Sequence, residues 1–81
     1  MPVKPLNRSL AVYLSKHQLS GKFHKQIEIF TNNPRHPSLH TELLEPKTAG
    51  VYSFRLDKKY RVLFIIVDSQ AEIVDINLHY K

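Results

Sequence analysis

Apolar residues in the first part of the chain recur at helical spacing, which predicts two helices. The first covers residues 5–17, where Pro5 and Asn7 are typical of a helix start. The second follows Ser20, a possible N-cap, and ends before Pro34. Because the connection is short, we expect the helices to fold back as an antiparallel hairpin. The apolar faces consist of Leu6, Leu10, Tyr13 and Leu14 in the first helix and Phe23, Ile27 and Phe30 in the second, with Lys22, Lys25 and Gln26 facing outward.

After Gly50 the apolar period changes to that of a strand. Residues 51–57, 60–67 and 72–79 predict three strands, and the short polar turns between them predict an antiparallel meander. Segment 60–67 is almost continuously apolar, which predicts burial on both faces and a central place in the sheet. Residues 38–44 predict a loop or one short turn. In the first strand, alternation places Tyr52, Phe54 and Leu56 on one face and Ser53 and Arg55 on the other. In the last strand, it places Val74, Ile76 and Leu78 on one face and Asp75, Asn77 and His79 on the other.

These elements predict a single α+β domain over residues 1–81, with an N-terminal antiparallel helical hairpin packed on a three- to four-stranded antiparallel sheet. Residues 2–4 give only a weak indication of an extra edge strand. The composition, 42% hydrophobic and 23% charged residues, is that of a globular domain. The longest uninterrupted apolar run, residues 62–67, is too short to cross a bilayer as a helix, so no membrane partner is expected. Because the chain has no cysteine, it suits a reducing cytoplasm.

Positive charge is concentrated in the first half of the chain. The formal net charge is +5 and the isoelectric point about 9.7. Residues 1–40 contain six basic side chains and one acidic side chain, whereas residues 41–81 contain six of each. We therefore expect an anionic polymer as partner.

One arginine interrupts the apolar middle strand. A guanidinium at Arg61 is costly there unless it is paired or functional. Arg55 and His79 also lie opposite the apolar faces of their strands, and Tyr80 follows directly, so one pairing register would bring all four onto one surface. The structural alternatives are an ion pair of Arg61 with Asp75 or Glu72, a surface His79 and an edge Tyr80.

Two guanidiniums, an imidazole and an aromatic ring are the groups that metal-independent RNA cleavage needs. Arginine binds phosphate, histidine transfers protons near neutral pH, and tyrosine stacks on bases. His36 and His40 have no third ligand at a credible spacing, so neither a metal nor another cofactor is expected. The candidate RNA-binding lysines are Lys47, Lys58, Lys59 and Lys81. The structural alternative for the pair Lys58-Lys59 is an ordinary solvated turn.

Five patterns occur in order along the chain. They are His-Pro-Ser-Leu-His at 36–40, Leu-Leu at 43–44, Gly-Val-Tyr-Ser-Phe-Arg-Leu-Asp at 50–57, Tyr-Arg-Val-Leu-Phe at 60–64 and His-Tyr at 79–80. In this order they resemble the RelE/ParE superfamily of bacterial type II toxins. The resemblance covers most of the chain and implies a helical hairpin against an antiparallel sheet.

The resemblance also implies roles for individual residues. Arg61 matches the arginine that holds the scissile phosphate, and Arg55 matches a second basic position. His79 and Tyr80 match the YoeB-like pair of general acid and nucleotide-positioning ring. The family's general base has no aligned counterpart, since the YoeB-like glutamate falls at Pro37 or Ser38, Glu42 is close but not aligned, and the two RelE-like lysines correspond to Ser53 and Arg55. His40 is the candidate that remains near a basic position of the family.

The function implied is a ribosome-dependent messenger RNA endonuclease that inhibits translation and is neutralised by a cognate antitoxin protein. The partners implied are therefore the antitoxin, the ribosome and mRNA. Two alternatives stay open at this point. One is a non-nucleolytic toxin that resembles the ParE branch and inhibits DNA gyrase, against which the His-Tyr ending argues. The other is an inactive relic that only binds its antitoxin.

Overall fold

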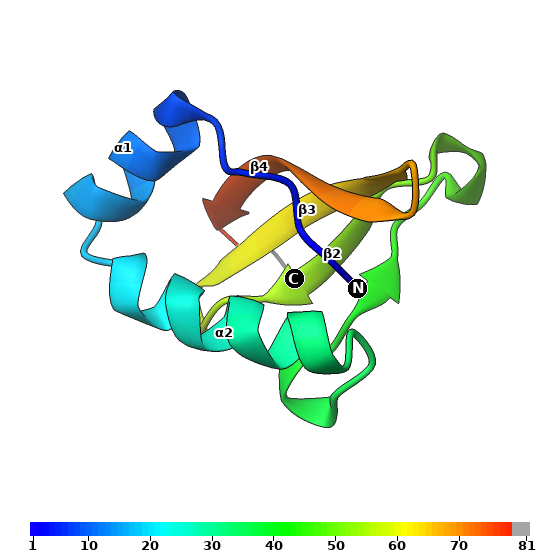
Figure 1. The fold of residues 1–81 in the computed structure, drawn as a ribbon, viewed down its shortest axis with the longest axis horizontal. Helices are drawn as coiled ribbons and strands as arrows, with labels where there is room; N and C mark the ends of the chain where they lie inside the picture. The colour runs from blue at the N-terminus through cyan, green and yellow to red at the C-terminus, as the bar shows by residue number, and fades with distance from the viewer. Residues whose placement is uncertain (79–81) are drawn as a thin grey trace.

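Two helices precede a four-stranded antiparallel sheet in the computed structural model of this protein, which describes residues 1–78. The α+β fold class with an N-terminal helical pair is thus confirmed. Figure 1 shows both helices joined by a short connection, with the N-terminal segment passing beside β4. The elements in chain order are α1 (Arg8–Lys16), α2 (Ser20–Asn32), the 3-10 helix η1 (Pro37–Leu39), β1 (Glu42–Leu43), the 3-10 helix η2 (Lys47–Ala49), β2 (Tyr52–Arg55), β3 (Tyr60–Val67) and β4 (Gln70–Leu78).

Helix α1 begins at Arg8, later than the predicted residue 5. The Asn7 side-chain oxygen accepts a hydrogen bond from the Leu10 N–H at 2.9 Å and caps the helix there. The residues before Asn7 are extended instead. Val3 forms a parallel bridge with Ala71, so the weakly indicated edge strand is present as a single bridge beside β4.

Helix α2 differs from its prediction in two side chains. Ser20 is already helical, and the capping position is Leu19, which makes no side-chain cap and is buried. Gln26 does not face outward. It is buried, and its Nε2 donates a 2.7 Å hydrogen bond to the Arg55 carbonyl oxygen. This bond satisfies both a buried amide and the last carbonyl of β2.

The sheet has the order β1-β2-β3-β4, so β3 lies between two strands as predicted. The prediction that β3 is buried on both faces is wrong. Val62 and Phe64 on the helix side are buried, whereas Leu63 and Ile65 on the other side are only partly buried, because the helices cover one face. The predicted loop at residues 38–44 contains η1 and the edge strand β1, which pairs with β2.

Strand β4 contains a bulge that the predicted alternation missed. Leu63 pairs with Asp75 and Phe64 with Ile73, which leaves Val74 without a partner on β3. Val74 is therefore 42% exposed. Leu78, predicted on the same apolar face, is also exposed, and only Ile76 of that predicted set is buried.

Aromatic rings form the centre of the core between α2 and the sheet. Phe30 of α2 is fully buried. Its ring stacks on Phe54 with centroids 5.1 Å apart and meets Phe64 edge-on at 5.0 Å. These contacts fix α2 against β2 and β3, and they leave the opposite face of the sheet free for polar chemistry.

Candidate functional site

The two candidate arginines share the sheet face opposite the helices. Arg55 is the last residue of β2 and Arg61 the second of β3, and they are direct partners in the antiparallel register. Side chains of directly paired residues point to the same face. The structure therefore brings together two of the residues that the sequence singled out. His79 and Tyr80, predicted to join them, lie outside the described residues, as does Lys81.

Arg61 is positioned by a neutral side chain. Its Nε donates a 3.2 Å hydrogen bond to the Asn77 side-chain oxygen, and the Asn77 amide donates a 2.8 Å bond to an Asp75 carboxylate oxygen. Asp75 thus orients the group that holds Arg61 and does not form the direct ion pair that was the structural alternative. Glu72, the other partner in that alternative, contacts Lys4 at 3.5 Å.

The charge of both arginines stays unneutralised within the described part of the chain. The ion pairs found among residues 1–78 are Lys4–Glu72 and Lys22–Asp57, and neither contains Arg55 or Arg61. Arg55 is exposed and Arg61 is partly buried. Two adjacent guanidiniums with free donors are chemically able to coordinate an anion such as phosphate through both side chains.

A hollow of about 230 Å³, which we call the arginine hollow, surrounds this pair. His40 reaches it from the residue after η1, where the backbone is left-handed at φ 47°. Glu42 reaches it from β1, where it pairs with Ser53. Among the described lining residues, His40 and Glu42 are the two whose side chains, an imidazole and a carboxylate, can act as a base. The lining consists of His40, Glu42, Ser53, Arg55, Tyr60 and Arg61.

Glu42 is a lining residue with base chemistry to which sequence reasoning gave no role. Strand β1 has two residues, which is too short for an alternating pattern to be visible. The pairing of Glu42 with Ser53 also depends on how the chain returns from α2 through η1. The available signal was an acidic residue two positions after the candidate His40.

The four candidate lysines do not form one group. Lys58 and Lys59 lie in the turn between β2 and β3, three and four residues after Arg55. Lys47 lies in η2, which precedes the other end of β2. Lys47 is therefore separated from the arginine pair by the length of that strand, roughly 10 Å for four residues.

Asp57 organises the turn that carries the two lysines. One carboxylate oxygen accepts hydrogen bonds from the backbone N–H groups of Lys59 at 2.8 Å and Tyr60 at 2.7 Å, and the other contacts the Lys22 ammonium at 2.9 Å. Burial raises the pKa of Asp57, but the hydrogen bonds from Lys22 and from the two N–H groups outweigh it and hold that pKa below its ordinary value. The turn is thus fixed by a carboxylate that stays ionised.

The described region contains neither a cluster of metal-ligating side chains nor a membrane-spanning helix. Among residues 1–78, no group of three or more His, Cys, Asp or Glu side chains is arranged to hold a metal ion. The helices of the same region are too short or too polar to cross a membrane.

Comparisons with known proteins identify the fold. No family model matches the sequence, and no curated protein matches it. Among solved structures, the chain is similar to a YoeB/ParE toxin from Agrobacterium tumefaciens, with a TM-score of 0.72 and 17% identity over 99% of this chain and 100% of that one. It is also similar to the YoeB dimer from Staphylococcus aureus, with a TM-score of 0.70 and 18% identity over 98% and 94% of the two chains.

A third similar structure is the YoeB–YefM complex from Staphylococcus aureus, with a TM-score of 0.69 and 18% identity over 95% of this chain and 100% of that one. The chain therefore has the fold of the YoeB/ParE toxins over nearly its whole length. The fold implied by the resemblance of the motifs is therefore confirmed.

Proposed function

We propose that this protein is the toxin of a type II toxin–antitoxin system and that it cleaves messenger RNA on the ribosome. The observation that carries the proposal is the register of β2 and β3, which pairs Arg55 directly with Arg61 on the helix-free face. The fold shared with YoeB/ParE toxins supports the same proposal.

In the proposed reaction, the 2′-oxygen of a ribose attacks the adjacent phosphodiester of the same RNA strand. The 2′-hydroxyl gives its proton to a base, its oxygen bonds to phosphorus, and the bond from phosphorus to the 5′-oxygen breaks. An acid protonates that 5′-oxygen, so the products are a 2′,3′-cyclic phosphate and a 5′-hydroxyl. Arg55 and Arg61 bind the phosphate oxygens and stabilise the charge that grows on them.

The proton-transfer roles are distributed over the arginine hollow and the chain end. Glu42 and His40 are the candidate bases, because both line the hollow that contains the arginines. His79 is proposed as the acid and Tyr80 as the ring that positions the nucleotide, both from the family resemblance. The lysines at 58 and 59 would hold the RNA backbone beside the site.

Cleavage of mRNA by purified protein with ribosomes tests the proposal. We expect Arg61→Ala to reduce the cleavage rate on the order of 10²-fold or more, as loss of a transition-state donor does. Arg8→Ala is the matched control, because Arg8 is the first residue of α1 and lines neither the arginine hollow nor the turn beside it. Equal rates for the two variants would refute the role of Arg61.

The same assay separates the two candidate bases. Glu42→Gln and His40→Gln each remove one proton acceptor while keeping a side chain of similar length. In the variant that lacks the base, the cleavage rate should no longer fall toward low pH as it does in wild type. The other variant should keep the wild-type shape of the pH–rate profile. If mRNA stays intact with the wild-type protein and DNA supercoiling by gyrase is inhibited, the ParE-like alternative replaces this proposal.

The proposed partner is a cognate antitoxin with an acidic segment that covers the arginine hollow. The solved YoeB–YefM complex supports a partner of this class. The proposed target, mRNA on the ribosome, places the activity in the cytoplasm. Expression of the protein alone should arrest growth, and coexpression of the neighbouring gene should relieve that arrest. Growth arrest that no neighbouring gene relieves would refute the partnership.

A further inference from the structure

A second hollow lies beside the arginine hollow, and the proposed cleavage reaction does not use it. It occupies about 640 Å³ between the end of α1, the start of α2 and the β2–β3 turn, and we call it the turn hollow. Its volume is within the range of small-molecule and nucleotide sites. Tyr60 lines both hollows, so they adjoin at this residue.

Aromatic rings form one wall of the turn hollow. The exposed His17 ring lies over Tyr13, with centroids 4.2 Å apart and planes tilted by 35°. The His17 and Tyr60 centroids are 5.9 Å apart, and the Tyr60 hydroxyl lies 3.4 Å from His17 Nδ1. The His17 ring is thus held from two sides while it remains open to solvent. Such a fixed, accessible ring is a stacking surface for a nucleic-acid base.

Lysines form the opposite rim. Lys22, Lys58 and Lys59 line the turn hollow together with one carboxylate, Asp57. That carboxylate is already occupied by Lys22 and by two backbone N–H groups. Within residues 1–78, Lys58 and Lys59 take part in no ion pair. The unneutralised charge at this rim is therefore positive and attracts an anion.

We propose that the turn hollow binds the nucleotide next to the dinucleotide whose phosphate Arg55 and Arg61 hold. Its base stacks on His17 and Tyr60, and its phosphate lies between Lys58 and Lys59. The inference rests on the proposed function, since it assigns the adjacent part of the same RNA. A single-stranded nucleic acid fits better than an acidic peptide, because a ring wall combined with a lysine rim binds a base and a phosphate together.

Binding of uncleavable RNA to the isolated protein tests the inference. In 2′-O-methyl oligonucleotides the attacking hydroxyl is blocked, so affinity is measured without reaction. We expect lengthening a dinucleotide by one nucleotide to raise the affinity of the wild-type protein about tenfold, the effect of one stacked base. His17→Ala should remove most of that gain and leave dinucleotide affinity unchanged, and Lys59→Gln should also remove most of the gain.

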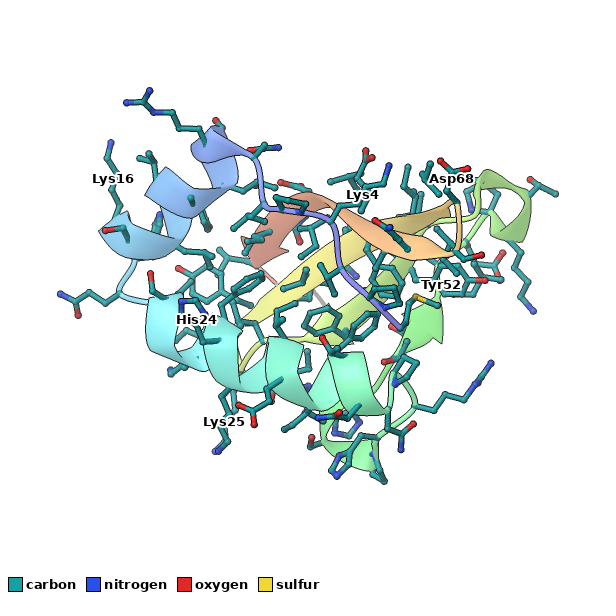
Figure 2. All side chains as sticks on the ribbon, in the orientation of Figure 1. Lys4, Lys16, His24, Lys25, Tyr52 and Asp68 are labelled. Carbon is teal, nitrogen blue, oxygen red and sulfur yellow. The ribbon has the colours of Figure 1, made fainter. Side chains whose placement is uncertain are left out.

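Matched variants separate loss of the site from loss of structure or charge. His24→Ala and Lys16→Gln remove the same groups at positions outside the lining of the hollow, and Figure 2 shows Lys16 pointing away from the body of the molecule. Both should keep the tenfold gain. His17→Phe keeps a ring and should keep most of the gain, whereas loss of the gain in His17→Phe would refute stacking as its cause.

Two further results would overturn the inference. An equal gain on lengthening for wild type and His17→Ala would show that the extra nucleotide binds elsewhere. Tighter binding of a poly-glutamate peptide than of the trinucleotide, lost in Lys59→Gln, would assign the hollow to an acidic protein. Failure of the proposed function has a different signature, because mRNA would then stay intact on ribosomes while the length-dependent binding persisted.

Discussion

Replacing Arg55 by glutamine should stabilise the folded protein while it inactivates the site. Arg55 and Arg61 are direct cross-strand partners, and neither has an ion-pair partner among residues 1–78. Like charges directly opposite each other in a sheet cost about 0.2–1 kcal/mol. Because Arg55 is exposed, solvent screening places the cost near the middle of that range, at about 0.5 kcal/mol. For a domain of this size, that gain corresponds to a rise in Tm of about 2–4 °C.

Thermal unfolding of wild type, Arg55→Gln and Arg55→Lys at two salt concentrations measures this effect. Arg55→Lys keeps the charge and should show no gain. The advantage of Arg55→Gln should shrink at about 1 M salt, where the screening length falls to roughly 3 Å. The hydrogen bond from Gln26 goes to the backbone carbonyl of residue 55, so the substitution leaves it in place.

A lower Tm for Arg55→Gln, or a gain that salt does not change, would refute the reasoning. Arg61→Gln is the less clean variant, because it also removes the hydrogen bond to Asn77. The functional half of the prediction is a large loss of mRNA cleavage by Arg55→Gln. A residue whose removal stabilises the fold and abolishes activity is retained for its chemistry rather than for packing.

Two further predictions concern the turn and the core. Asp57→Ala removes both the charge and the turn hydrogen bonds and should cost about 1–2 kcal/mol in urea unfolding, whereas Asp57→Asn keeps an acceptor oxygen and should cost less. Because the folded pKa of Asp57 is lowered from 3.8, the ionic part of this stabilisation is present above about pH 3.8 and is lost as the pH falls through the folded value. A stability difference between wild type and Asp57→Asn that did not shrink as the pH falls below 3.8 would contradict this. Phe30→Ala empties the centre of the core and should cost about 3–5 kcal/mol of a total of roughly 4–12. Val12→Ala, at an exposed position, should change stability by less than about 0.5 kcal/mol, and similar losses for the two variants would refute the assigned core.

The placement of Arg55 and Arg61 was within reach of the sequence because it depends on local chemistry. A short polar turn joins two strands of clear alternation, and Asp57 fixes that turn by binding two of its backbone N–H groups. A short turn allows few pairing registers between the two strands. Whether the two arginines point to the same face of the sheet is therefore decided within a few residues of the turn. The same reasoning predicted the three long strands and both helices.

The parts that sequence reasoning missed depend on contacts between distant segments. Glu42 enters the site because a two-residue strand pairs with β2 after the chain has passed through η1. Gln26 is buried because its amide meets a backbone carbonyl that lies 29 residues away in sequence. Val74 leaves the predicted apolar face because a bulge inserts it between paired residues. Local periodicity contains no information on any of these pairings.

One electrostatic cause links activity, inhibition and stability in this proposal. The amide of Asn77 orients Arg61 without neutralising it, so the fold keeps two like charges side by side. An anion that bridges both guanidiniums removes the repulsion and adds charge-assisted hydrogen bonds. A scissile phosphate and a carboxylate of the proposed antitoxin would gain from the same pair, and therefore they compete for it. An antitoxin that blocks the arginine hollow must then also stabilise the domain, and it must stabilise wild type more than Arg55→Gln.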